Sequence, residues 1–351
     1  MVANFRYLGV EFKSNLSWRI MKAKVLKKAK ERLALLSKAV TSGLAPDACL
    51  KIWDTLIRPV LEYSIEVWGV TKWPEAERLQ MEMGRMILGV PARTANDAVR
   101  GELGLWSVES RSKLAILRWW AKIIKMDKNR LCYKVYLFRK DHLKDNRPSW
   151  CRYVRDTLLE LNLGAKWDSE EIGSYSSWCS TVKQRLAEKE EKEWNNRLVQ
   201  HSKLRLYRIL KSKLRLESYL LTLPRKIRQV FTQFRCGTND LRIETGRWSK
   251  EAVEDRKCCL CGGEEIEDEM HVLLDCWVYN QLRTEMYVRI RNITGDQYRL
   301  DLHGDDRQWM MRTLIGENIL DLDHRKRMQV VVANYLCKAM KRRKMLMDAT
   351  D

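Results

Sequence analysis

Residues that break or turn a chain are scarce in this sequence. Its 351 residues include 16 glycines and 6 prolines, which disfavours folds built from many short strands and tight turns. Hydrophobic residues make up 45% of the chain and charged residues 32%, a balance that suits a folded protein rather than a disordered one. We therefore expect a mostly α-helical protein, long enough for two or three hydrophobic cores.

Long apolar runs are missing as well. No run reaches transmembrane length, and no basic stretch followed by an apolar core marks a signal peptide at Met1. We expect an intracellular protein, in the nucleus or the cytoplasm, with no membrane partner. Its ten cysteines would then be thiols or metal ligands rather than disulfides.

Positive charge is abundant. The chain carries 66 Lys and Arg against 46 Asp and Glu, a formal net charge of +20. Such an excess creates a long-range positive potential. Nucleic acid is the commonest large polyanion that binds to a surface of this kind. A surface charged for solubility and a membrane-surface protein are the alternatives, although solubility alone rarely needs so one-sided a balance.

Helical periodicity dominates the pattern. Residues 5–12 alternate as one short strand, and because no second strand adjoins it we expect its sheet to lie outside this chain. We predict a helix ending at Gly43, one from Pro46 with a kink at Pro59, one from Pro74 to Gly89, and one capped by Ser107. The first of these buries a face at three- and four-residue steps: Leu26, Ala29, Leu33, Leu36 and Val40.

The chain divides into four expected parts. Residues 1–125 form a compact helical domain and residues 126–223 a helical connector. That connector contains a polar linker at 141–149 and a charged helical stretch at 183–216, whose basic residues are expected on a solvated face. Residues 224–285 form a basic segment around a cysteine cluster. Residues 286–351 form a C-terminal helical region with a basic tail, which is either a nuclear localisation patch or a solvated helix end.

The strongest local signal is a cluster of four metal-ligand residues. Cys258-x2-Cys261-x9-His271-x4-Cys276 supplies three thiolates and one imidazole. Four such ligands suit Zn²⁺ in a closed, tetrahedral, structural site. Gly262 and Gly263 let the first pair turn back on a tight knuckle. The alternative is a set of buried thiols with an incidental histidine.

The residues around this cluster are expected to be bystanders. Cys259 makes a poorer pair with Cys261 and is predicted to be a non-ligand. The acidic residues that follow are expected on a solvent-exposed loop, since thiolates outcompete carboxylates for zinc; they are Glu264, Glu265, Glu267, Asp268 and Glu269.

Taken in order, several segments resemble the C-terminal part of a non-LTR (LINE-type) retrotransposon reverse transcriptase, namely its thumb, connector and CCHC zinc segment. In that family a Tyr-Leu-Gly strand ends the palm and precedes a helical thumb. The matching segments are Tyr7-Leu8-Gly9-Val10, Arg58–Tyr63, Val67-Trp68, Leu79-Gln80, Leu88-Gly89, Glu102-Leu103-Gly104, Leu241–Trp248, the CCHC cluster, Tyr279 and Arg283. The resemblance is good at both ends of residues 5–285 and thin in the middle.

The resemblance implies a thumb-like domain at 1–125 and a nucleic-acid-binding role without catalysis. The family's paired palm aspartates lie upstream of the Tyr-Leu-Gly strand, so polymerase activity is not expected of this chain. Thumb helices hold the template–primer duplex, which makes Lys24, Lys27, Lys28 and Arg32 candidate backbone contacts. Arg242, Arg247 and Trp248 flank the zinc segment and are candidates for binding RNA or DNA by charge and stacking. At least one of Trp119 and Trp120 is expected in the core.

Other functions compete with nucleic-acid binding. The chain could be a protein-interaction module that docks to an intact retroelement polymerase or to another retroelement protein. It could be a nuclease, although no Asp/Glu/His cluster beyond the zinc ligands has metal-activating spacing. It could also be a relic with no selected role.

Overall fold

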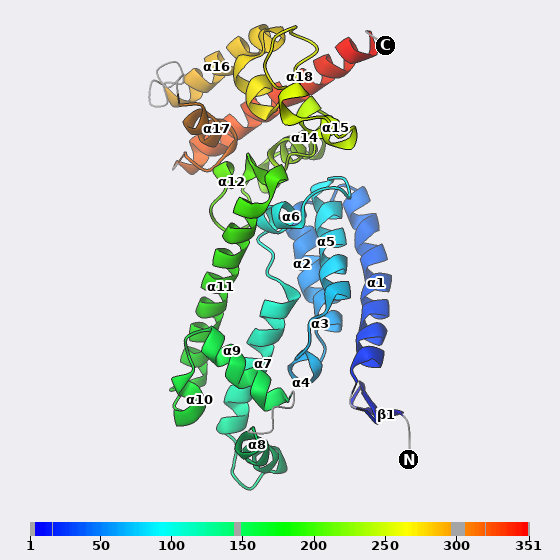
Figure 1. The fold of residues 1–351 in the computed structure, drawn as a ribbon, viewed down its shortest axis with the longest axis vertical. Coiled ribbons are helices and arrows are strands. Elements are labelled where there is room, and N and C mark those ends of the chain that lie inside the picture. Colours follow the sequence, from blue (N-terminus) through cyan, green and yellow to red (C-terminus); the bar gives the residue numbers. More distant parts are fainter. Residues whose placement is uncertain (1–3, 16, 144–148, 296–305, 320, 350–351) are drawn as a thin grey trace. The chain divides into compact units, whose positions relative to one another are not determined.

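The structure of the protein is a computed structural model that describes residues 4–15, 17–143, 149–295, 306–319 and 321–349. It is mostly helical, with 70% helix and 3% strand, which confirms the expected class. The helices are α1 (Arg19–Thr41), α2 (Pro46–Ile52), α3 (Arg58–Leu61), α4 (Ile65–Trp68), α5 (Pro74–Leu88), α6 (Asn96–Leu103), α7 (Val108–Ile124), α8 (Leu131–Asp141), α9 (Trp150–Glu160), α10 (Ala165–Ser169), α11 (Tyr175–Gln200), α12 (Tyr207–Leu210), α13 (Tyr219–Thr222), α14 (Arg225–Arg235), α15 (Arg242–Trp248), α16 (Asn280–Thr294), α17 (Arg307–Ile315) and α18 (Leu322–Asp348) (Figure 1).

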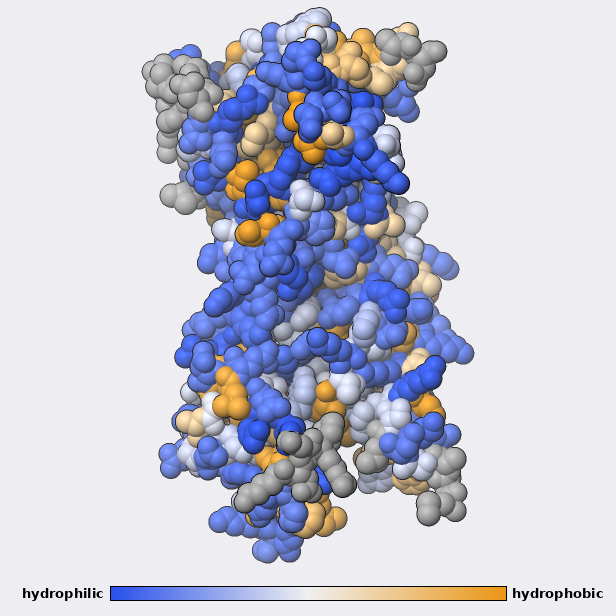
Figure 2. Space-filling model, in the orientation of Figure 1, coloured by the Kyte–Doolittle hydropathy of each residue, from blue (hydrophilic) through white to orange (hydrophobic). Residues whose placement is uncertain are grey.

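The chain forms two compact units, each assembled from separate segments. Unit 1 comprises Met1–Ala39, Cys49–Gln80 and Trp106–Glu193, and unit 2 comprises Val40–Ala48, Met81–Leu105 and Trp194–Asp351. The four-part division expected from the sequence stays a prediction. No helix among the described residues is long and apolar enough to cross a membrane. The face drawn in Figure 2 is mainly hydrophilic, and its hydrophobic residues are gathered in small separate patches.

The N-terminal segment is a β-hairpin, so the single strand expected over residues 5–12 is wrong. Strands β1 (Asn4–Tyr7) and β2 (Val10–Lys13) pair antiparallel, with Tyr7 opposite Val10. Leu8 and Gly9 form the two-residue turn, both with positive φ (44° and 83°), as a tight hairpin requires. The partner strand therefore lies within this segment. The Tyr63 hydroxyl donates to the Leu8 carbonyl at 2.7 Å, which joins the hairpin turn to the segment between α3 and α4.

The helix ends that local signals predicted are confirmed. α1 ends just before Gly43, whose φ is +95°. α5 begins at Pro74 and ends before Gly89, whose φ is +67°. The Ser107 hydroxyl caps α7 by accepting from the Ser110 amide at 3.0 Å. These features depend on residues close together in sequence.

The sequence predicts one helix from Pro46 with a kink at Pro59, but the structure has several short helices there. α2 gives way to a π-helical turn, η1 (Trp53–Ile57), then to α3 and, after a further turn, to α4. Pro59 has no amide hydrogen, so the regular ladder cannot continue there. The π turn nevertheless keeps Trp53 and Ile57 buried in unit 1.

The core of unit 1 is rich in aromatic side chains. Trp120 of α7 is fully buried, and its indole N–H donates to the Tyr136 hydroxyl at 3.1 Å. Its ring lies 6.2 Å from that of Trp167 and 5.4 Å from that of Trp178. Trp119 packs against this core while half-buried. The expectation that at least one of the two adjacent tryptophans is core is confirmed.

The charged stretch at 183–216 is only partly helical. α11 ends at Gln200, and the basic residues that follow lie in short turns, including η2 (Ser202–Leu204) and α12. Lys211 is 2% exposed and forms an ion pair with Glu217. The expectation that it lies on a solvated helix face is therefore wrong. Residues 144–148 of the expected linker lie outside the described residues.

Unit 2 is organised around a buried polar network. Arg235 of α14 is fully buried and donates to the Glu102 carboxylate at 2.9 Å. The Tyr219 hydroxyl also hydrogen-bonds Glu102, and the Glu217 amide donates to the Glu102 carbonyl at 2.9 Å. Gly104 has φ +65° and lies so close to the chain that a Cβ would come within 2.8 Å of the Leu216 nitrogen. The Glu102–Gly104 segment is thus a core element of unit 2.

The last part of the chain is helical, as expected. α17 and α18 follow α16, and α18 packs along α16 and α14 within unit 2 (Figure 1). Ala333, Leu336 and Ala339 are among the α18 residues that are fully buried. α18 therefore forms part of the support for the segment between α15 and α16, which holds the cysteine cluster.

Candidate metal centre

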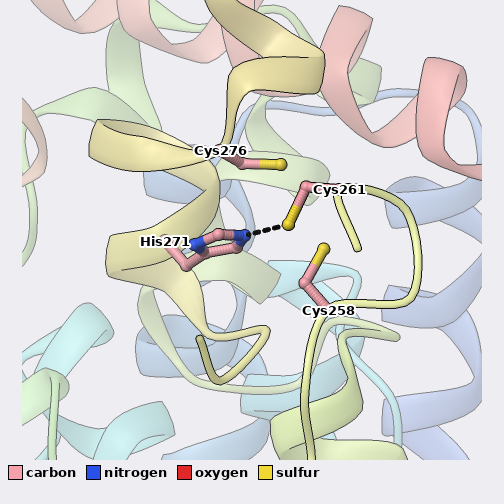
Figure 3. Close-up of side chains that lie close together, drawn as sticks. All are labelled: Cys258, Cys261, His271 and Cys276. Atoms are coloured by element: carbon pink, nitrogen blue, oxygen red, sulfur yellow. Dashed lines mark hydrogen bonds between the residues drawn. The ribbon is translucent and has the colours of Figure 1, made fainter. Parts of the chain in front are cut away.

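The first two cysteines of the cluster lie on a tight loop. Lys257 and Ile266 form an isolated antiparallel bridge, and the Cys258 amide donates to the Glu265 carbonyl at 2.9 Å. Gly262 turns the chain with φ +64°, as the sequence predicted. This loop, residues 257–266, is called the knuckle below. It directs Cys258 and Cys261 toward each other (Figure 3).

The second pair is presented by one turn of π-helix, η4 (His271–Asp275). Asp268 begins the turn by accepting from the His271 amide at 2.9 Å, and the Cys276 amide closes it by donating to the His271 carbonyl at 2.8 Å. An α-helical turn aligns residues three or four positions apart. The wider π turn brings two residues five positions apart to the same side.

The four side chains predicted as ligands lie together. One ligand atom from each of Cys258, Cys261, His271 and Cys276 lies within 4.8 Å of all the others. The His271 Nε2 atom is 3.5 Å from the Cys261 sulfur (Figure 3). All but Cys261 are buried. Three sulfur atoms and one nitrogen converging on one point can hold a metal ion.

Cys259 lies outside this cluster. Its side chain is exposed, and its sulfur faces the Met347 sulfur of α18 at 3.5 Å. The prediction that it is a non-ligand agrees with this arrangement, because adjacent residues on a tight loop point in different directions.

A carboxylate orients the histidine. The His271 Nδ1 atom lies 2.6 Å from a Glu265 carboxylate oxygen. A proton on Nδ1 donated to Glu265 leaves Nε2, the atom that faces the cysteines, as the metal-binding nitrogen. Glu265, His271 and Asp275 also lie close enough together to form a ligand set. However, Asp275 pairs with Arg307, and the His271 atom that faces Glu265 is Nδ1, which carries a proton when neutral imidazole binds a metal through Nε2.

Hydrogen bonds among the four side chains shift their pKa values. A hydrogen bond to Cys276 and burial raise the pKa of the Cys258 thiol to about 12, and that same hydrogen bond lowers the pKa of Cys276. Burial lowers the pKa of His271, but hydrogen bonds to Cys258, Glu265 and Cys261 outweigh it and raise the pKa to about 9. A bound cation displaces these protons, since thiolate and neutral imidazole are the forms that bind metal.

Side chains from α16 and α18 fix the backbone of the π turn. The Arg283 guanidinium, itself buried, donates to the Leu273 carbonyl at 3.1 Å and to the Cys276 carbonyl at 2.8 Å. The Tyr335 hydroxyl donates to the Val272 carbonyl at 2.6 Å. Carbonyls at the end of a helical turn lack intrahelical partners, so these donors hold the ligand-bearing turn in place.

The acidic residues from Glu264 to Glu269 are not all on an exposed loop, so that expectation is wrong in part. Glu264 and Glu265 are exposed, but Glu267 and Glu269 are 0% and 1% exposed. Glu269 accepts from Arg205 at 2.7 Å and from Asn239 at 3.0 Å. Burial of these carboxylates is compensated by charged and polar partners distant in sequence, which local composition cannot reveal.

The predicted nucleic-acid contacts of α1 fall into two groups. Lys24 is ion-paired with Glu11, and the Arg32 guanidinium donates to the Leu56 carbonyl. Lys27 and Lys28 are exposed, and neither has an ion pair among the residues that the structure describes. Only this second pair leaves its full charge available to a phosphate.

The residues predicted to contact nucleic acid around the cluster also differ in whether their side chains are already paired within the protein. Arg242 pairs with Glu251 at 2.8 Å, and Arg247 with Glu244 at 3.1 Å. Trp248 is 58% exposed, and the Arg93 guanidinium lies 4.9 Å from its ring centroid. Its ring is open to solvent beside a cation.

Three features near the cluster escaped prediction. Glu265 orients His271, although a carboxylate six residues before a histidine ligand was a readable signal. The predicted basic tail lies on α18, where Lys341, Arg342 and Lys344 are exposed and have no ion pair within the described parts of the chain. What the sequence did not predict is that this end of α18 packs against the segment that holds the cluster. The third is Trp277, which follows the last ligand and is 63% exposed.

The chain matches no family model, no curated protein and no solved structure.

Proposed function

We propose that Cys258, Cys261, His271 and Cys276 bind one structural Zn²⁺. The observation that supports this is the convergence of three sulfur atoms and one imidazole nitrogen within 4.8 Å. Zinc prefers such a set, and four protein ligands complete a tetrahedron with no position for an activated water. The ion would join the knuckle to the π turn and so stabilise unit 2.

Metal analysis of the purified protein tests this assignment. We expect one zinc per chain, lost in Cys261→Ser and His271→Ala but kept in Cys259→Ser, the matched control on the same loop. Chelation should lower the midpoint of thermal unfolding, since metal binding energy is folding energy in such sites. Protein prepared with zinc present that contains no stoichiometric metal would exclude the site.

We further propose that the protein binds the backbone of RNA or DNA and has no catalytic activity of its own. The observation that carries this proposal is the presence of exposed cations without ion pairs among the described residues, including Lys27 and Lys28 on α1 and Lys341, Arg342 and Lys344 on α18, in a chain of net charge +20. Cations that are not neutralised internally are free to replace counterions on phosphates. The resemblance to the thumb and zinc segment of a LINE-type reverse transcriptase supports the same role.

The candidate metal centre supports binding without catalysis. Both groups of potential metal ligands among the described residues contain His271, so they do not supply a second metal to activate water or a phosphate. The proposed zinc site is also closed by its four protein ligands.

Titrations at several salt concentrations test the binding proposal. Affinity for a single-stranded or duplex oligonucleotide should fall linearly with the logarithm of salt, with a slope of about 0.7–0.9 per phosphate contact. The double variant Lys27→Ala/Lys28→Ala should reduce that slope by up to about two. Lys24→Ala is the control on the same helix, because Glu11 already neutralises Lys24. Protein that ignores polynucleotide at low salt would refute the proposal.

One observation favours a second function, docking to another protein. On α8, Leu131, Val135 and Phe138 are 76%, 52% and 58% exposed, and their spacing places them on one helix face. Tyr133 and Tyr136 of the same helix are buried in unit 1. An apolar row on the outer face is typical of a helix that packs against a partner, such as an intact retroelement polymerase. Loss of that association in Val135→Asp, with nucleic-acid binding unchanged, would support it.

A further inference from the structure

Only two tryptophans of this chain are exposed, and both belong to the unit that holds the metal cluster. The sequence has 14 tryptophans, all of them within the described residues. Trp248 and Trp277 are 58% and 63% exposed, and the other twelve are buried or half-buried. A large aromatic surface left in water is a common mark of a binding site.

The metal-binding segment holds the Trp277 side chain in place. The indole N–H donates to the carbonyl of Cys261 at 3.0 Å, which ties the ring to one proposed ligand of the knuckle. Its own backbone follows another ligand, Cys276, in the short turn η5 (Trp277–Tyr279). Val278 and Tyr279 anchor that turn, since they are 6% and 0% exposed. The ring is therefore preorganised, and a ligand that contacts it causes little further loss of side-chain entropy.

Cations lie on the helix that packs against the knuckle region. Near its C-terminal end, α18 contacts this region twice, through Arg343 to Glu267 and through Met347 to Cys259. Lys341, Arg342 and Lys344 are exposed on these same turns. An anchored aromatic surface thus accompanies available positive charge within one unit, as in proteins that bind single-stranded nucleic acid.

We infer that Trp277 stacks on an unpaired base of single-stranded RNA or DNA while the α18 cations contact the adjoining phosphates. This inference rests on the proposed nucleic-acid binding and names the form that this unit recognises. Duplex bases already stack on their neighbours and offer no free face to an indole ring. Unit 2 therefore distinguishes single strands from duplexes through Trp277. It binds the phosphates of both forms through the α18 cations.

The test compares three probes of equal length with the full, zinc-loaded chain. They are a single-stranded thymidine oligonucleotide, the same backbone with abasic sites, and a duplex. The wild-type protein should bind the thymidine strand about 5–100 times more tightly than the abasic strand, the range expected for stacking of one base. Trp277→Ala should lose most of this preference and retain its affinity for the duplex.

Two further variants separate stacking from folding and from general apolar contact. Trp277→Phe should retain most of the preference, because a phenyl ring still stacks. Trp277→Leu should lose it, although it keeps an apolar side chain of considerable size. Zinc content, measured for each variant, identifies any that disturb the metal site.

The outcomes distinguish this inference from the function on which it rests. If Trp277→Leu and Trp277→Ala prefer the thymidine strand as strongly as wild type while salt-dependent binding persists, Trp277 does not stack and only the inference fails. A protein-docking role for Trp277 would give this result. If the wild-type protein binds none of the probes, the proposed function and the inference both fail.

Discussion

The guanidinium of Arg343, near the end of the chain, donates two hydrogen bonds to the carboxylate of Glu267, at 2.7 and 2.8 Å. Glu267 is fully buried, and it also accepts from the backbone amide of Arg242 at 2.8 Å. One carboxylate thus links the segment that holds the cysteine cluster to the start of α15 and to α18. Because Glu267 is buried and only 12% of the Arg343 side chain is exposed, loss of this pair affects folding much more than the loss of a surface ion pair would.

Replacing Arg343 by Ala should destabilise unit 2. The variant leaves a buried carboxylate without its cation, which costs about 3–5 kcal/mol. Urea unfolding followed by circular dichroism, with zinc release recorded in the same samples, measures this loss. Arg342→Ala is the control, because the neighbouring side chain is exposed and should change stability by less than about 0.5 kcal/mol. Equal stability of the two variants would contradict the role assigned to Arg343.

Removing the Glu265 carboxylate should weaken metal binding without abolishing it. Glu265 accepts from His271 Nδ1 at 2.6 Å, and the loss of such an orienting partner typically lowers metal affinity about 10–100-fold. Competition with a chromophoric chelator measures the change in Glu265→Ala. Glu264→Ala is the matched control, since Glu264 is exposed and pairs with Lys257 rather than His271. Unchanged zinc affinity in Glu265→Ala would exclude a positioning role.

Unit 1 should lose stability in acid through Glu160. Its carboxylate lies 2.8 Å from the ammonium groups of Lys113 and Lys189. Burial raises the pKa of Glu160, but hydrogen bonds and charge from the two lysines outweigh it and lower the pKa below its ordinary 4.5. A pKa lowered in the folded state adds stability that is complete above pH 4.5 and is lost as the pH falls through the folded value.

Urea unfolding of Glu160→Gln and wild type at several pH values checks this prediction. The variant should be less stable at neutral pH, and the difference should shrink as the pH falls below 4.5, the ordinary pKa. Glu171→Gln is the control, because Glu171 is exposed and its carboxylate has no ion pair within the described residues. A difference that stays constant in strong acid would show that protonation of Glu160 is not responsible.

Local signals were sufficient for helix ends in α1, α5 and α7 and for identifying the four side chains that converge. Ser107 caps α7 through an amide three residues away, and Gly89 ends α5 through its own φ of +67°. The four proposed ligands likewise lie in one short segment, so their spacing limits how they can converge. The β-hairpin was missed because Leu8, rather than a typical turn residue, occupies the first position of its turn at φ +44°.

The sequence by itself determined the mostly helical class and which four side chains meet at the candidate metal centre. Both follow from interactions between residues close together in the chain, whose geometry the backbone restricts. Only the tertiary structure decided which charged and aromatic residues are buried. Glu267 is buried because Arg343, 76 positions away, reaches it, whereas Trp277 stays in solvent with only its indole N–H held by Cys261. Burial depends on partners that local composition does not specify.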